Sequence, residues 1–101
     1  MQLEQHADHT ALLIRGPVRL GEVPILLEHA RVASARGLPV TVDLAEAEHL
    51  HCSAWQVLIA LEREVQRRGQ RFTPRALSPQ ARAMLDFLEL GRWSSDQKDQ
   101  G

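Results

Sequence analysis

The chain has 101 residues, the length of one domain with a single two-layer core. Hydrophobic residues make up 44% and charged residues 25%, the proportions of a folded globular protein rather than a disordered one. Twelve basic and thirteen acidic residues give a net charge of -1, which excludes broad electrostatic capture of nucleic acid or anionic membrane.

Cysteine content and hydropathy restrict the compartment. The single cysteine, Cys52, excludes an internal disulfide and a zinc site made of cysteines alone, and it fits a reducing environment. The first ten residues, MQLEQHADHT, lack the apolar segment of a signal peptide. No apolar run approaches the ~20 residues that span a bilayer. We therefore expect a cytoplasmic protein that does not insert into membranes.

Three helices are predicted from apolar residues at helical spacing. The first ends before Gly37, the second runs from about Ser53 to Arg68, and Ser78 and Pro79 open the third as cap and first residue. The apolar faces are Val23, Leu26, Leu27, Ala30 and Ala33 in the first helix; Ala54, Leu58, Leu61 and Val65 in the second; and Ala81, Met84, Leu85 and Leu88 in the third.

Four strands are predicted between and before the helices. The second strand stops at Gly16-Pro17. The third reads VTVDL, a pattern typical of a central strand buried on both faces, and a connecting loop over residues 45–50 follows it. Pro74 assigns the last strand to an edge. The strands are expected within residues 1–8, 11–14, 40–44 and 71–77.

The predicted order, β-β-α-β-α-β-α, defines an α/β protein. We expect a mixed sheet with parallel central strands and helices mainly on one face. A single domain is expected over residues 1–93, and the polar residues 94–101, SSDQKDQG, are expected to form a flexible tail.

Ser53 is the candidate regulatory residue. It is predicted to cap the second helix, where its hydroxyl would accept a hydrogen bond from a free amide of the first turn. The same position favours a phosphate, because backbone amides and the helix dipole attract negative charge. Capping alone accounts for this serine, and phosphorylation is the sharper alternative.

The neighbouring side chains suggest two kinds of chemistry that the spacing does not support. His49, His51 and Cys52 are soft ligands, but they match no common closed metal site and lack a fourth ligand. A catalytic Cys52 would need a thiolate beside a base and a third, orienting residue. No glycine-rich phosphate loop is present. We therefore expect no enzyme activity, no catalytic residue, no metal and no cofactor.

Trp55 has two interpretations of equal weight. It lies off the predicted apolar stripe, so it either packs in the core or forms an exposed anchor of a protein interface. The arginines between residues 63 and 75 are interpreted as a solvated helix face rather than as a nucleic-acid site.

Three segments together resemble the STAS family, named after sulfate transporters and anti-sigma-factor antagonists. VTVDLAEAEHL is similar to that family's strand and loop with a hydrophobic-Asp-Leu-small pattern. HCSAWQVLIALEREVQRRG lies where the family has Asp-Ser-Ser-Gly-Leu at the start of a helix, and ALSPQARAMLDFLELGRW is similar to its closing helix. The resemblance covers about residues 2–93.

The resemblance implies a non-enzymatic regulatory interaction module of the anti-sigma-factor antagonist type. Its partner would be an anti-sigma factor or a related serine kinase, with Ser53 matching the family's phosphorylated residue and Asp43 its strand-end aspartate. Self-association as a homodimer stays open. The partner-binding residues implied are Asp43, Glu48, His49, His51, Cys52, Ala54 and Trp55.

The chain also departs from the family pattern around Ser53. His51 replaces the acidic residue two places before it, Cys52 the adjacent serine, Ala54 the glycine and Trp55 the leucine. These departures support an alternative of a different class, a constitutive subunit not switched by phosphorylation. Such a subunit resembles the small STAS component of a bacterial phospholipid-transport ABC complex, and its partner would be the ATPase subunit.

Overall fold

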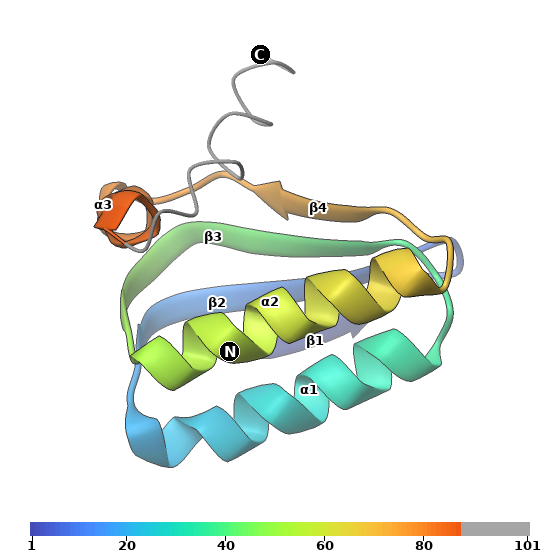
Figure 1. Cartoon of the computed structure of the whole chain (residues 1–101), viewed down its shortest axis with the longest axis horizontal. Coiled ribbons are helices and arrows are strands. Elements are labelled where there is room, and N and C mark those ends of the chain that lie inside the picture. Colours follow the sequence, from blue (N-terminus) through green and yellow to red (C-terminus); the bar gives the residue numbers. More distant parts are fainter. Residues whose placement is uncertain (88–101) are drawn as a thin grey trace.

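The structure of the chain, a computed structural model, describes residues 1–87 (Figure 1). The elements are, in chain order, β1 (Gln2–Gln5), β2 (Thr10–Val18), the 3-10 turn η1 (Leu20–Glu22), α1 (Val23–Ala35), β3 (Val40–Leu50), α2 (Cys52–Arg67), β4 (Phe72–Arg75) and α3 (Pro79–Phe87). Within these residues no helix is both long enough and apolar enough to cross a membrane.

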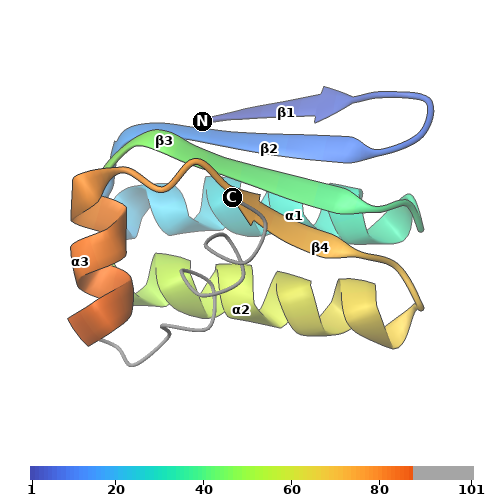
Figure 2. The ribbon, with the colours of Figure 1, turned by 90° about the horizontal axis from the view of Figure 1, so that it is seen from above.

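The strands form one four-stranded sheet in the order β1-β2-β3-β4. β1 is antiparallel to β2, whereas β2, β3 and β4 are parallel to one another. α1 and α2 run side by side beneath one face of the sheet, and α3 crosses its end against β3 (Figure 2). The predicted fold class, a mixed sheet with parallel central strands and helices mainly on one face, is confirmed.

The central strand β3 is buried on one face rather than on two. Val40, Val42 and Leu44 are fully buried, whereas the alternate residues Thr41 and Asp43 are half-buried. Successive side chains of a strand point to opposite faces, so the buried set faces α1 and α2. The prediction of burial on both faces is therefore wrong, because the helices cover only one side.

Two strands are longer than predicted. β2 continues through Gly16-Pro17 to Val18, and β3 continues to Leu50 where a loop was expected. The pairing persists because the register shifts twice, so that β3 contributes extra residues opposite β2. Such irregularities accommodate Pro17, and Gly16, on the strand opposite the extra residues, has a positive φ of 68°. Ala47 and Leu50 are consequently part of the core.

The helices follow the predicted stripes closely. Leu26, Ala30 and Ala33 of α1 are buried, whereas Leu27 is 37% exposed beside α2. All four predicted stripe residues of α2 are buried. The predicted cap of α3 is confirmed: the Ser78 hydroxyl accepts a hydrogen bond from the Ala81 amide at 3.0 Å and donates one to the Ala47 carbonyl at 2.6 Å.

β4 is an edge strand, as Pro74 predicted. Leu88 of the predicted α3 face and the predicted tail, residues 94–101, lie outside the described residues.

Candidate protein-interaction surface

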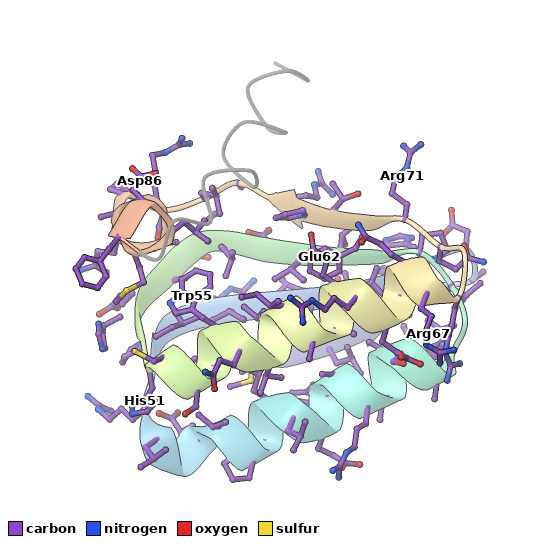
Figure 3. All side chains as sticks on the ribbon, in the orientation of Figure 1. His51, Trp55, Glu62, Arg67, Arg71 and Asp86 are labelled. Carbon is purple, nitrogen blue, oxygen red and sulfur yellow. The ribbon has the colours of Figure 1, made fainter. Side chains whose placement is uncertain are left out.

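One end of the molecule collects most of the residues singled out in the sequence. Because β2 and β3 are parallel, their carboxyl ends lie at the same edge of the sheet. The turn η1 follows β2 there, α2 starts there directly after β3, and α3 packs against β3 (Figure 1). Figure 3 shows His51 and Trp55 at this end and Arg67 at the other.

The first turn of α2 is capped by His51, not by Ser53. His51 has the extended backbone of an N-cap residue, and its Nδ1 accepts a hydrogen bond from the Ser53 amide at 3.1 Å. Its own amide donates to the Val18 carbonyl at 2.9 Å, which fixes the start of α2 to the end of β2. Ser53 is therefore the second residue of the helix and is half-exposed. The prediction that Ser53 is the cap is wrong.

Trp55 and Ala54 belong to the core. Trp55 is 1% exposed and Ala54 is fully buried. Both residues lie in the first turn of α2 and are buried, whereas His51 before them is half-buried; Figure 3 shows Trp55 on the side of α2 that faces the sheet. The interpretation of Trp55 as an exposed interface anchor is wrong, and neither side chain is available for direct contact with a partner.

Asp43 also lies apart from this end. The longer β3 places it within the strand rather than at its end, on the face opposite the buried Val42 and Leu44. Its Oδ1 accepts a hydrogen bond from the Ala45 amide at 2.9 Å. Seven residues of extended strand separate Asp43 from Leu50, which corresponds to roughly 20 Å along the chain. The prediction of a strand-end aspartate near Ser53 is therefore wrong.

The remaining candidates border a groove. Glu48 and His49 are exposed on β3, and Cys52 is exposed as the first residue of α2. The groove has a volume of about 450 Å³ and lies between these residues and α3, which contributes Met84 and Phe87. Phe87 is 82% exposed, the largest exposure among the large hydrophobic side chains of residues 1–87.

The contribution of α3 was missed in the sequence, although a signal was present. Gln80, Ala83 and Phe87 recur at helical spacing and form a second stripe beside the predicted core face of α3. Phe87 lies with Ala83 and Met84 along one groove, and exposed apolar side chains that gather in this way, unlike single ones, indicate an interaction surface. The turn η1 lies on the other side of the start of α2 from α3 (Figure 1), and its Leu20 is 62% exposed.

Electrostatic perturbation is concentrated elsewhere in the molecule. Within residues 1–87, resolved pKa shifts fall on Asp8, Glu64 and Arg67. Hydrogen bonds from Arg67 and Arg68 lower the pKa of the Glu64 carboxyl to about 2. Among the same residues no cluster of three or more metal-binding side chains occurs. The groove end thus combines exposed apolar and polar side chains, the composition of a binding surface.

Comparison with known proteins places this geometry in a family. A family model described as "Mlab, STAS domain" matches residues 1–94. The chain belongs to the STAS family. Among curated proteins none matches.

Two solved structures share the fold. The anti-sigma factor antagonist SpoIIAA in its unphosphorylated form has a TM-score of 0.78 at 18% identity, over 91% of this chain and 83% of that one. The second structure is the Bacillus cell fate determinant SpoIIAA in its phosphorylated form. It has a TM-score of 0.73 at 19% identity, over 91% of this chain and 86% of that one.

Proposed function

We propose that the chain is a non-enzymatic regulatory module that binds a partner protein through the surface around the start of α2. This surface consists of Ser53, the groove between β3 and α3, and Leu20 on the opposite side. The observation that carries the proposal is that two exposed hydrophobic side chains, Phe87 of α3 and Leu20 of η1, belong to elements at the same end of the molecule as the first turn of α2 with its half-exposed Ser53 (Figure 1). Exposed apolar groups around a polar centre are typical of protein interfaces.

The partner of the first candidate function is an anti-sigma factor or a related serine kinase. The likeness of the fold to an anti-sigma factor antagonist supports this choice. Such a partner would be met in the cytoplasm, where the exposed Cys52 stays reduced.

Ser53 is the proposed phosphorylation site of this module. As the second residue of α2, it lies where the helix dipole stabilises a phosphate, and its side chain is half-exposed. A phosphate adds roughly -1.5 to -2 charges, enough to disfavour a partner that covers the neighbouring apolar groups.

The second candidate is a constitutive subunit, whose partner would be the ATPase of a bacterial phospholipid-transport ABC system. Two observations favour keeping it. The description of the matching family model names Mlab and does not name an anti-sigma factor antagonist. His51, Cys52 and Ala54 also replace the residues that surround the phosphorylated serine in the family pattern. In this case the same surface binds its partner permanently.

An affinity capture from the source lysate separates the two candidates. Wild type, Ser53→Ala and Ser53→Asp serve as baits, and Gln66→Glu serves as a control with the same added charge at an exposed residue near the other end of α2. The switch predicts that Ser53→Asp alone loses a kinase-type partner and that wild-type Ser53 carries phosphate. A fixed subunit predicts an ATPase retained by all four baits. Loss of the partner by Gln66→Glu alone would contradict both.

A further inference from the structure

The cap of α2 uses a side chain whose hydrogen-bonding ability depends on pH. The Nδ1 atom of His51 accepts the hydrogen bond of the Ser53 amide, so it carries no proton, and the ring proton lies on Nε2. A protonated imidazole has no acceptor left, and it places a positive charge at the positive end of the helix dipole. Protonation of His51 therefore removes the cap and adds an unfavourable charge at the same position.

An acidic residue at this position would behave differently. The STAS pattern resembled by this chain has an acidic residue two places before the phosphorylated serine, where this chain has His51. A carboxylate accepts a hydrogen bond from the first turn and keeps that ability down to about pH 4. Histidine is the side chain that loses it between pH 5 and 8.

We propose that His51 is a positioning residue whose protonation state controls the first turn of α2, and hence the presentation of Ser53. Neutral His51 holds the Ser53 amide through Nδ1, whereas the His51 backbone amide holds the start of the helix to β2 in either protonation state. Protonated His51 releases that amide and loosens the turn that carries Ser53. Any effect of this cap on partner binding rests on the proposed function. The pH dependence of the cap rests only on the hydrogen bond between the Ser53 amide and His51 Nδ1.

The charged groups at this end are of both signs, and the structure pairs none of them with His51 within residues 1–87. After β2, Arg19 adds positive charge, and the Glu22 carboxylate already accepts the Arg19 amide at 3.0 Å. β3 contributes the exposed Glu48 and His49, and α2 contributes Cys52. The groove residues from α3 are uncharged: Gln80, Ala83, Met84 and Phe87.

The Ser53 amide reports this cap directly. Its exchange with water is measured by NMR, with saturation transfer at pH 8 and hydrogen–deuterium exchange at pH 5. Each rate is divided by the intrinsic rate at that pH, and the two protection values are compared. The variants are His51→Ala, which removes the acceptor, and His51→Asp, which supplies one at both pH values. His49→Gln is the matched control, because it removes the neighbouring exposed histidine and leaves the cap in place. Core amides such as those of Leu26 and Ala33 show whether each variant is folded.

We expect the wild-type Ser53 amide to lose about fivefold in protection between pH 8 and pH 5, the factor that corresponds to a typical cap. His49→Gln should behave like wild type. His51→Asp should keep its protection at both values, and His51→Ala should lack it at both. Equal protection of wild type and His51→Ala at pH 8 would overturn the proposal, and so would a pH dependence abolished by His49→Gln.

Partner capture at the same two pH values distinguishes the two proposals. Binding by wild type that weakens at pH 5, together with binding by His51→Asp that does not, supports both. If no variant captures a partner while the Ser53 amide follows His51, the cap inference holds and the proposed function fails. If a partner is captured but the amide ignores His51, the cap inference fails and the proposed function stands.

Discussion

The two ends of α2 differ in how their polar groups are satisfied. At the carboxyl end, Glu64 accepts hydrogen bonds from Arg67 and Arg68 on the same helix. Nearby, Arg36 follows α1 and donates to Thr10 Oγ1 and to the His6 carbonyl, both at 2.8 Å, which ties the β1–β2 turn to the helices. At the amino end, His51 provides the cap through Nδ1, and the exposed hydrophobic side chains of Leu20 and Phe87 belong to elements at the same end.

This difference assigns the carboxyl end of α2 to the stability of the fold and the amino end to the binding of a partner. Glu64, Arg67, Arg68 and Arg36 at the carboxyl end are hydrogen-bonded within the chain, so these groups offer little to a partner. The amino end keeps apolar area in contact with water, which costs free energy in the isolated chain and is recovered when a partner covers it. The following predictions test this separation, beginning with the largest effect.

Replacing Trp55 should cost the most. Trp55→Ala removes a fully buried indole beneath the binding surface, and we expect a loss of about 3–5 kcal/mol in the free energy of unfolding, measured with urea. The exposed neighbour Gln56 is the control, and Gln56→Ala should stay within about 0.5 kcal/mol of wild type. A loss below about 1 kcal/mol for Trp55→Ala would mean that the side chain is not in the core.

The two helix caps at this end of the molecule should respond differently to pH. Ser78→Ala removes the cap of α3 and the hydrogen bond to the Ala47 carbonyl, so we expect a loss of about 1–2 kcal/mol. A hydroxyl does not titrate in this range, so the loss should be the same at pH 8 and at pH 5. A Ser78→Ala loss of stability at pH 8 but not at pH 5 would show that the α3 cap itself depends on pH. A pH dependence of stability at this end of the molecule could then not be assigned to His51.

Glu64 should give the smallest effect. Its pKa is lowered from 4.5 to about 2, so its ion pairs stabilise the fold fully above pH 4.5 and lose that contribution as the pH falls toward 2. The group is exposed to solvent, and salt should weaken the contribution further. Urea unfolding at pH 6 and pH 3 should therefore show a slightly flatter pH dependence for Glu64→Gln than for wild type. A steeper dependence in the variant would contradict the ion pairs.

The sequence was sufficient to predict the order of elements and the helix faces, because apolar residues recur at regular spacing in α1 and α2. It was not sufficient to predict the length of β3. Between Leu44 and Leu50 the buried residues are three apart, since bulges interrupt the alternation, and this spacing resembles a loop or a helix rather than a strand.

The candidate site was predicted in part. Glu48, His49 and Cys52 lie near the start of α2, because the chain is continuous there, and their role in partner binding stays a prediction. The cap was assigned to Ser53 because serine is a common N-cap and helix boundaries are uncertain by one or two residues. Trp55 could not be assigned, because burial at the first turn depends on how closely α2 approaches the sheet. The groove depends on α3, which comes from a distant part of the chain.

The binding surface itself is tested most directly by the affinity of the captured partner for Phe87→Glu and for Gln66→Glu. Both variants add one negative charge at an exposed residue, the first beside the groove and the second near the far end of α2. We predict that Phe87→Glu weakens binding at least about tenfold, as expected for an interface anchor, while its free energy of unfolding stays within about 0.5 kcal/mol of wild type. Gln66→Glu should bind as wild type does. Unchanged binding by Phe87→Glu would contradict the account, as would equal weakening by both variants.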